Sequence, residues 1–382
     1  MISQVLPIMA VLPSLAYSLI SLWCGRAFAL RKKTASGHTP PVTIIKPVKG
    51  LDADSFTNFA SFCCQDYPCF QIIFAVASAA DPVIPVIERL RTEFPDRDIE
   101  LVVDSRVHGP NYKVCNLINA YARAQHDIII ICDSDILVGE RYLREVCAFF
   151  ADERVGLVTS PYRSPGVRGA ATAVEAMGFT CEMVPNVLVA LKFEGLSFAL
   201  GASIAVRRGA LEKIGGFRAL VDYLADDYQL GHKVRQAGYR IELSAYFVES
   251  VMRREGLAEV LSRQLRWART MRACRPGGYF AYGMTHPLPA AGLALLLSGC
   301  SAGGIAAVLF LYAVRFLAVT IYSRSIVRDG IFPRWLWLLP VRDALSFVTW
   351  GLAFLGNRVR WRGHLYRLLP GGRIAEVPEK NN

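Results

Sequence analysis

The stretch Ile128-Ile129-Ile130-Ile131-Cys132-Asp133-Ser134-Asp135 is a β-branched run that ends in two carboxylates separated by one serine. A short apolar run of this kind predicts a strand that is buried on both faces, as in a parallel sheet. Ligands of open α/β sheets bind beyond the carboxyl ends of the strands, where Asp133 and Asp135 are expected. Two carboxylates at that place suit Mg²⁺ or Mn²⁺ together with substrate phosphates. A polar turn that closes the strand is the alternative interpretation.

Similar apolar runs recur every 27 to 29 residues, at 42–45, 71–76, 99–103, 128–132 and 155–159. Helix-like stretches lie between them, at 54–64, 83–94, 111–124 and 139–150. This alternation predicts a doubly wound, mostly parallel α/β sheet. Farther on, the patterns predict strands at 205–207 and 241–248, a helix within 222–236 that Gly238 closes, and a basic amphipathic helix at 257–271. For 166–200, a membrane-grazing helical segment and an acceptor-side insertion stay open.

The first 25 residues contain no charged side chain. Residues 5–23 are long enough to cross the ~30 Å hydrocarbon core of a bilayer, and they lack the basic leader of a cleavable signal peptide. A positive cluster follows this apolar run, formed by Arg26, Arg31, Lys32 and Lys33. The positive-inside rule therefore predicts an N-terminus outside the cell and a cytoplasmic location for the rest.

Apolar segments return near the C-terminus. Residues 288–322 carry only Arg315 as a charge, and residues 335–355 carry only Arg342 and Asp343. The first segment is long for one tilted span and short for two full ones. A hairpin, a re-entrant segment and a single span therefore stay open, with two or three C-terminal passes.

The sequence thus predicts a multi-pass membrane protein in four parts: an anchor at 1–25, a cytoplasmic catalytic domain at 39–280, a membrane region at 287–357 and a basic tail at 358–382. Arginines and a tryptophan at 358–362 are typical of the headgroup layer. The net charge of +11 is concentrated in basic patches, around 253–254, 263–275 and 358–367. Beside apolar segments, these patches favour a membrane surface or anion sites over nucleic acid. The ten cysteines show no Cys-x-x-Cys pairs, which favours reduced, buried thiols.

Four further residues could carry chemistry. Lys113 stands near the start of a predicted helix, where a cation and backbone N–H groups favour phosphate, although a surface lysine is the alternative. Asp81 precedes Pro82 after the second strand, where it could hold a nucleotide or simply cap a helix. Asp226 and Asp227 stand at a predicted helix start and could provide a general base or an N-cap.

Arg263, Arg266 and Trp267 are spaced to lie on one helix face. Two guanidinium groups beside an indole can stabilise a diphosphate leaving group. The alternative is an amphipathic helix that lies on anionic lipid.

In their order along the chain, these residues resemble the D, D-x-D, [ED]-D and (Q/R)-x-x-R-W series of inverting glycosyltransferase-A enzymes. The matching residues are Asp81, Asp133-Ser134-Asp135, Asp226-Asp227 and Arg263-x-x-Arg266-Trp267. Flanking stretches are similar to the ceramide glucosyltransferase family and its bacterial relatives, some of which are tied to hopanoid lipids; these stretches are Pro47-Val48-Lys49-Gly50, Cys64-Gln65-Asp66-Tyr67-Pro68, Asn111-x-Lys113-x-x-Asn116-Leu117, Cys132-Asp133-Ser134 and Leu224-Ala225-Asp226-Asp227-Tyr228. The resemblance covers residues 39–279.

The resemblance implies a glycosyltransferase-A-type sheet with N- and C-terminal transmembrane helices, and a role for each residue. The donor would be held by Asp81, Lys113, Asp133, Arg263, Arg266 and Trp267, and the metal, Mg²⁺ or Mn²⁺, by Asp133 and Asp135. Asp227 would be the base with Asp226 in support, although the adjacent pair leaves open which one takes the proton. The residues before Asp81, Ser78-Ala79-Ala80, depart from the family's more polar pattern, so the donor sugar stays open.

The implied reaction transfers one hexosyl unit from a UDP-sugar to the hydroxyl of a membrane lipid, ceramide or a hopanoid, at a bacterial inner membrane. A processive polysaccharide synthase shares the motif series but usually needs more spanning helices than this chain offers. A polyprenyl-phosphate glycosyltransferase and a non-catalytic nucleotide-sugar-binding membrane protein are further alternatives. The sequence leaves the sugar, the lipid and the oligomeric state undetermined.

Overall fold

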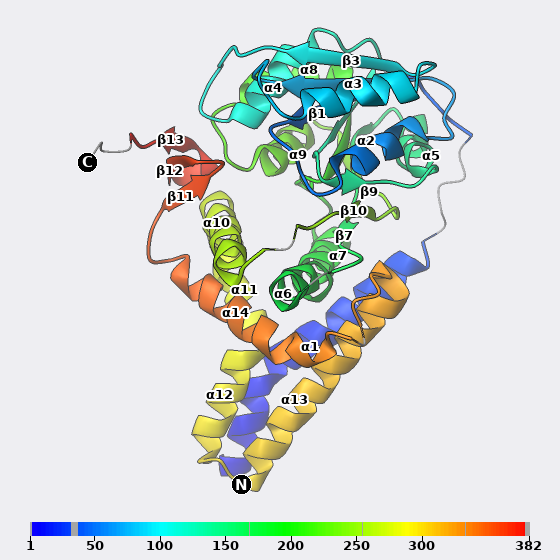
Figure 1. Cartoon of the computed structure of the whole chain (residues 1–382). Helices are drawn as coiled ribbons and strands as arrows, with labels where there is room; N and C mark the ends of the chain where they lie inside the picture. Colours follow the sequence, from blue (N-terminus) through cyan, green and yellow to red (C-terminus); the bar gives the residue numbers. More distant parts are fainter. Residues whose placement is uncertain (1, 32–36, 168, 254, 333, 379–382) are drawn as a thin grey trace. The chain divides into compact units, whose positions relative to one another are not determined.

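The computed structural model describes residues 2–31, 37–167, 169–253, 255–332 and 334–378. The chain divides into two units, which we call the sheet unit and the helical unit after their main secondary structure (Figure 1). The sheet unit comprises 32–164 and 194–253, and the helical unit comprises 1–31, 165–193 and 254–382. The predicted catalytic range 39–280 contains parts of both. Some predicted features lie outside the described residues: Lys32 and Lys33 of the basic cluster, Arg254 of a basic patch and residues 379–382 of the tail.

The sheet unit is built on seven strands in the order β3-β2-β1-β4-β8-β6-β9. The strands are β1 Val42–Val48, β2 Phe70–Val76, β3 Asp98–Val103, β4 Ile128–Cys132, β6 Val155–Thr159, β8 Ser203–Arg207 and β9 Arg240–Leu243. Every pairing is parallel except those of β8 with β4 and β6. The mostly parallel sheet that the spacing of apolar runs predicts is therefore confirmed, and the parallel strands β1, β2 and β4 end at one edge.

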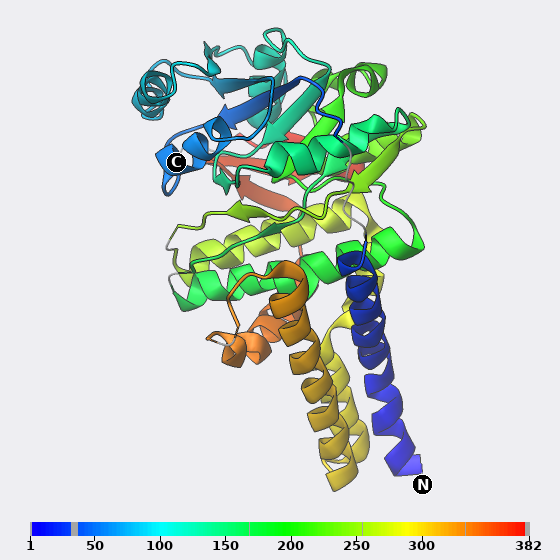
Figure 2. The same ribbon diagram turned by 90° about the vertical axis from the view of Figure 1, so that its right-hand side faces the viewer.

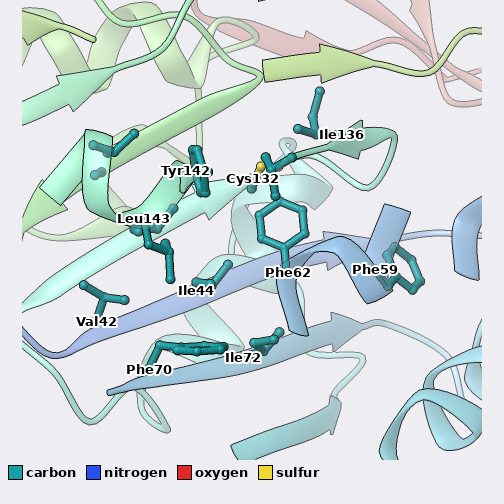
Figure 3. Packing of buried hydrophobic residues seen from close by; sticks show 14 of the residues in the cluster. Val42, Ile44, Phe59, Phe62, Phe70, Ile72, Cys132, Ile136, Tyr142 and Leu143 are labelled. Atoms are coloured by element: carbon teal, nitrogen blue, oxygen red, sulfur yellow. The ribbon is translucent and has the colours of Figure 1, made fainter. Parts of the chain in front are cut away.

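Helices connect these strands as the alternation predicts. They are α2 Ser55–Cys63, α3 Ile84–Glu93, α4 Tyr112–Tyr121, α5 Tyr142–Cys147, α8 Arg208–Lys213 and α9 Asp226–Gln236, with 3₁₀ turns η1 Ala148–Ala151 and η3 Phe217–Leu220. Figure 3 shows α2 and α5 packing apolar side chains against β1, β2 and β4. Phe62 from α2 meets Tyr142 from α5 edge to face, with ring centroids 5.9 Å apart. This packing fixes the strands whose ends carry the site.

The prediction of one strand over 241–248 is wrong. β9 stops at Leu243, and a turn follows in which the Ser244 hydroxyl accepts a hydrogen bond from Tyr246 N at 3.0 Å. Such a side-chain bond competes with continued pairing. A second small sheet then forms from β5 Ile136–Leu137, β10 Val248–Ser250 and β7 Tyr162–Arg163. As a result, β10 lies beside the segment that follows Asp135.

The helical unit contains the apolar segments. Its helices are α1 Ile2–Ala29, α6 Ala170–Gly178, α7 Val184–Phe193, α10 Leu257–Cys274, α11 Pro276–Tyr282, α12 Pro287–Ser298, α13 Ala302–Ile321 and α14 Leu339–Leu352. Two π-helical segments are η2 Phe179–Met183 and η5 Tyr322–Val327, and three 3₁₀ segments are η4 Gly283–Thr285, η6 Leu336–Leu338 and η7 Pro370–Gly372. Three helices in the described part are long and apolar enough to cross a membrane: 6–29, 170–193 and 302–327. A bent pair over 276–298 would make a fourth.

The segment 288–322 is a hairpin. α12 ends at Ser298 and is followed by Gly299 in a left-handed conformation (φ 58°), and Ser301 caps α13 by accepting a hydrogen bond from Gly304 N at 3.4 Å. Glycine closes the first helix at little steric cost. Figure 2 shows α1, α12 and α13 running side by side. The hairpin alternative is the one that the structure adopts.

The helical unit also pairs its buried charges. Arg315 of α13 donates to Asp343 of α14 at 2.9 Å, and Arg342 donates two hydrogen bonds to Glu182, each at 2.8 Å. The segment 166–200, which the sequence leaves open, is helical over 170–193. The basic tail folds into an antiparallel sheet of three strands, β11 Arg358–Trp361, β12 His364–Leu368 and β13 Ile374–Glu376.

Candidate functional site

Asp133 and Asp135 follow the C-terminal end of β4, as the apolar run predicts. The side chain of Asp133 is 38% exposed, and its Oδ1 forms an ion pair with the Lys113 ammonium at 2.7 Å. Asp135 accepts a hydrogen bond from the Ser250 hydroxyl, at the end of β10, at 2.9 Å. Burial and the neighbouring Asp133 raise the pKa of Asp135 to about 6. The turn after β4 thus presents one accessible carboxylate beside one whose negative charge is costly.

Lys113 links two separate pairs of carboxylates. It lies in the first turn of α4, and its ammonium lies 2.7 Å from Asp133 Oδ1 and 3.6 Å from Asp226 Oδ2. Burial alone would lower the pKa of Lys113, but Asp133 and Asp226 outweigh it and raise that pKa above its ordinary range. Asn111 caps α4 by accepting from Val114 N at 3.1 Å. The interpretation of Lys113 as a plain surface lysine is therefore wrong, since only 18% of its side chain is exposed.

Asp226 and Asp227 begin α9, as the sequence predicts. The Asn111 amide reaches across to the Tyr223 carbonyl at 2.7 Å and to Asp226 at 3.4 Å, so α4 positions the start of α9. Burial and Asp226 raise the pKa of Asp227 to about 6, although Lys113 opposes this. A β-carbon at Gly201 would lie 2.7 Å from Asp227 Oδ2. Glycine at this position leaves the carboxylate its space.

Asp81 lies after β2 and bonds to backbone groups. Its two carboxylate oxygens accept from Gly50 N at 3.1 and 3.0 Å, and Oδ1 also accepts from Val83 N at 3.0 Å. Asp81 therefore joins the loop after β1 to the start of α3. The N-cap of α3 is Val83 and it has no side-chain cap bond, so Asp81 orders the turn before the helix rather than capping the helix itself. An oxygen that accepts from an amide can also face a ligand.

Sequence reasoning missed three residues of this edge. Lys46, in the middle of β1, is fully buried; its ammonium donates to the Asp133 carbonyl at 2.9 Å and lies 3.8 Å from the Phe62 ring centroid. Asp52 accepts from the Ser134 hydroxyl, and Ser250 donates to Asp135. A lysine inside an apolar strand was a readable signal for the first, because lysine is almost never fully buried without a partner. Asp52 comes from the loop after β1 and Ser250 from the end of the short strand β10, and neither carries a comparable signal.

The donor set suits a divalent ion only in part. Within the described residues, no group of three or more His, Cys, Asp or Glu side chains could hold a metal. Asp133 and Asp135 are two hard oxygen donors, and a bound cation would offset the burial and the Asp133 charge that raise the pKa of Asp135. Mg²⁺ characteristically takes one or two carboxylates and completes its shell with water and substrate phosphates. The residues therefore fit a metal that is held jointly with a diphosphate.

Arg263, Arg266 and Trp267 lie on α10, in the helical unit. Arg263 donates to Glu175 Oε1 at 2.6 Å and to Glu255 Oε1 at 3.2 Å. Trp267 packs against Phe179, with ring centroids 6.3 Å apart. The structure therefore brings Lys113, Asp133, Asp135 and Asp226–Asp227 together in the sheet unit, and it gives the arginine motif its own partners in the helical unit.

Comparison with known proteins bears on the fold and the family of this chain. The mannosyltransferase PcManGT from Pyrobaculum calidifontis, solved with GDP-Man and Mn²⁺, superposes over 91% of this chain and 99% of its own with a TM-score of 0.58 and 19% identity, a likeness of fold. Ceramide glucosyltransferase 3 of Caenorhabditis elegans is 24% identical over 88% of this chain and 74% of its own length. Ceramide glucosyltransferase of Candida albicans is 33% identical over 27% of this chain and 21% of its own.

The family resemblance that the motifs predict is thereby confirmed, as is the glycosyltransferase-A-type fold. A profile of glycosyl transferase family 21 matches residues 6–374, almost the whole chain. The chain belongs to glycosyl transferase family 21.

Proposed function

We propose that this glycosyltransferase moves one hexosyl unit from a UDP-sugar to the primary hydroxyl of a membrane lipid, with ceramide as the acceptor and with inversion at the anomeric carbon. The observation that carries the proposal is the carboxylate cluster at one sheet edge, in which Lys113 bridges Asp133 and Asp226. The ceramide glucosyltransferase relatives support the acceptor class. The three candidate spans support an acceptor that stays in a bilayer.

The donor would be held at the ends of β1, β2 and β4. Asp81 is assigned to the nucleoside, and Lys113 and Asp133 to the diphosphate. Asp133 and Asp135 would hold Mg²⁺ or Mn²⁺, which when bound neutralises charge on the leaving diphosphate. Lys46 and Ser250 position this turn through their bonds to the Asp133 carbonyl and the Asp135 carboxylate. Arg263, Arg266 and Trp267 keep their assignment to the donor on the resemblance alone.

Asp227 is assigned as the general base. It takes the proton of the lipid hydroxyl while that oxygen bonds to the anomeric carbon and the bond from this carbon to the diphosphate oxygen breaks. A base is most effective when its pKa lies near the working pH, and the pKa of Asp227, near 6, meets this condition better than an ordinary aspartate. Asp226 is engaged by Lys113 and Asn111, which suits a supporting role.

The membrane segments have a physical reason in this scheme. A two-tailed lipid does not leave the bilayer, so the site must meet it at the surface, and we place the sheet unit on the cytoplasmic side. Basic residues near the membrane, such as Arg26 and Arg31 after the anchor, would each contribute ~1 kcal/mol of attraction to anionic headgroups.

The decisive experiment is expression in a host that lacks glycolipids, followed by mass spectrometry of the lipid extract. We expect one new species heavier by one hexose, whose parent mass is that of ceramide when ceramide is supplied. The Asp227→Asn variant, expressed at the same level, should give at least about a hundredfold less product. A ladder of added sugars would replace the proposal with a processive synthase, and a hopanoid or polyprenyl phosphate parent would replace the acceptor.

A further inference from the structure

The loop after β1 connects the two parts of the proposed donor site. Its Gly50 N donates to both oxygens of Asp81, which we assign to the nucleoside. Two residues later, the Asp52 carboxylate accepts from the hydroxyl of Ser134, in the turn that we assign to the diphosphate and its metal. A side chain held against Asp52 therefore lies close to the place where the nucleoside and the diphosphate would meet.

Arg253 is held against Asp52. Its Nη2 lies 3.8 Å from Asp52 Oδ1, while Oδ2 of the same carboxylate accepts from Ser134. One carboxylate thus separates the guanidinium from the middle of the Asp133-Ser134-Asp135 turn. Arg253 follows β10 and belongs to the sheet unit, so the whole arrangement lies within one unit.

The backbone before Arg253 is fixed on the same turn. Val251 N donates to the Asp135 carbonyl at 2.9 Å, and the Ser250 hydroxyl donates to the Asp135 carboxylate at 2.9 Å. β10 also pairs with β5, whose first residue, Ile136, directly follows Asp135. Arg253 therefore extends from a segment that is already ordered at this site, which lowers the entropic cost of binding a ligand there.

Arg253 differs from Lys46 and Lys113 in how readily it can change partners. Lys46 is fully buried and donates to the Asp133 carbonyl, and Lys113 pairs with the Asp133 carboxylate at 2.7 Å. The Arg253 side chain is 50% exposed, and its 3.8 Å ion pair is longer than a hydrogen bond. Because an exposed pair of this length contributes little to stability, the guanidinium can turn from Asp52 to a phosphate at small cost.

The guanidinium that the sequence motif assigns to the diphosphate is more firmly engaged. Arg263 pairs with two carboxylates of the helical unit, those of Glu175 and Glu255. Arg253 lies in the sheet unit, outside that motif, and no local pattern in the sequence distinguishes it.

We propose that Arg253 is a catalytic residue that exchanges its ion pair with Asp52 for a contact with the β-phosphate of the donor. The inference rests on the proposed function and adds a residue to it. When the bond between the anomeric carbon and the diphosphate oxygen breaks, its electron pair stays on that oxygen, so negative charge grows on the β-phosphate. A guanidinium offers paired hydrogen bonds to phosphate oxygens, and donors placed where charge develops stabilise the transition state.

The test compares a ligand that has a β-phosphate with one that lacks it, on the full chain purified in detergent with Mg²⁺. Calorimetric titration measures the affinities for UDP and UMP, which share the nucleoside and the α-phosphate. We expect Arg253→Gln to weaken UDP binding about 10- to 100-fold, through the loss of a hydrogen bond to a charged group, and to leave UMP binding within about twofold. Arg253→Lys keeps the charge and should recover part of the UDP affinity.

Arg240→Gln is the matched control, because it removes the same charge from a side chain of similar exposure, 46%, that also pairs with an aspartate, Asp152, at 3.0 Å. Arg240 begins β9, so it lies at the opposite edge of the sheet from the carboxylates. This variant should leave both affinities unchanged, and a thermal melt should give Arg253→Gln the Tm of the wild type.

The inference is overturned if Arg253→Gln weakens UDP and UMP binding equally, if it weakens neither, or if Arg240→Gln weakens UDP binding as much. Failure of the proposed function gives a different result. If the wild type transfers no hexose to lipid while its UDP affinity still depends on Arg253, the lipid acceptor is wrong and the contact with the β-phosphate stands.

Discussion

Buried charge is arranged in opposite ways in the two units. In the helical unit, Arg342 meets Glu182 and Arg315 meets Asp343, each cation with its own carboxylate. In the sheet unit, the ammonium groups of Lys113 and Lys46 lie among a larger number of carboxylates, those of Asp133, Asp135, Asp226 and Asp227, and negative charge is left over. Matched charges hold elements together, whereas an excess of one sign at a strand edge prepares a site for a ligand of the other sign. In this chain, the paired charges of the helical unit therefore indicate a structural role, and the unbalanced charges of the sheet unit indicate a ligand site.

The largest effect should come from Asp227→Asn. We expect turnover to fall by about 10²–10⁴, because the hydroxyl proton has no acceptor, while UDP affinity stays within about twofold. Steady-state kinetics and UDP titration measure the two quantities. Tm should not fall, since the substitution removes a carboxylate whose charge is costly where it stands. Near-normal turnover would exclude Asp227 as the base and transfer the role to Asp226.

The pH dependence of the wild type should show the same group. Burial and Asp226 raise the pKa of Asp227 to about 6, so kcat/KM should fall as pH drops below about 6, and the limb belongs to the coupled pair. Stability has the opposite sign. The folded carboxyl binds its proton more tightly than the unfolded one, so its contribution to stability is largest below pH ~4 and is lost as pH rises through 6. Asp227→Asn should remove this limb; an acid limb near pH 4 in the wild type would contradict the assignment.

Breaking a matched pair should cost stability instead. Arg342→Met leaves Glu182 buried without its guanidinium, and we expect a loss of about 3–5 kcal/mol in unfolding free energy. The double variant Arg342→Met with Glu182→Leu should recover much of it, because neither charge is then left alone. Thermal melts in detergent give the comparison. If the single variant is as stable as the wild type, the Arg342–Glu182 pair contributes nothing to the stability of the fold.

Asp135→Ala tests whether the excess negative charge of the sheet unit serves to bind a metal ion. We expect metal-dependent UDP binding to weaken by at least about tenfold, because one of two oxygen donors is lost. The measurement is a UDP titration with Mg²⁺ or Mn²⁺ and again with EDTA. The wild-type curves should differ between the two conditions, and the variant curves should converge. Identical wild-type curves in both conditions would show that UDP binding does not depend on a divalent metal, contrary to the proposal.

The smallest effect should come from Lys46→Met. Methionine nearly fills the volume, and burial already lowers the pKa of Lys46, so Tm should change little. The Asp133 carbonyl, however, loses the ammonium that fixes it, and donor affinity should fall about three- to tenfold. A large loss of Tm with unchanged donor affinity would show that Lys46 stabilises the fold and does not position the donor site.

The sheet was readable from sequence because strand spacing and β-branched runs are local signals. Asp133 and Asp135 were readable because they follow such a run directly, and Asp226 and Asp227 because they stand at a predicted helix start. Other features depend on contacts between distant segments. Glu175, which pairs with Arg263, lies 88 residues earlier in the chain. No local sequence pattern predicts this ion pair. The C-terminal hairpin was missed because its turn is Arg362-Gly363 rather than an asparagine-glycine turn, so the tail was interpreted as a headgroup-layer segment.

Gly201 offers a different way of reaching the site. Because even one methyl group there would lie 2.7 Å from Asp227 Oδ2, Gly201→Ala would push the carboxylate of the proposed base out of its place while every ionisable group stays in the chain. If Asp227 is the base, this variant should lose turnover by steric displacement alone, with all titratable side chains native.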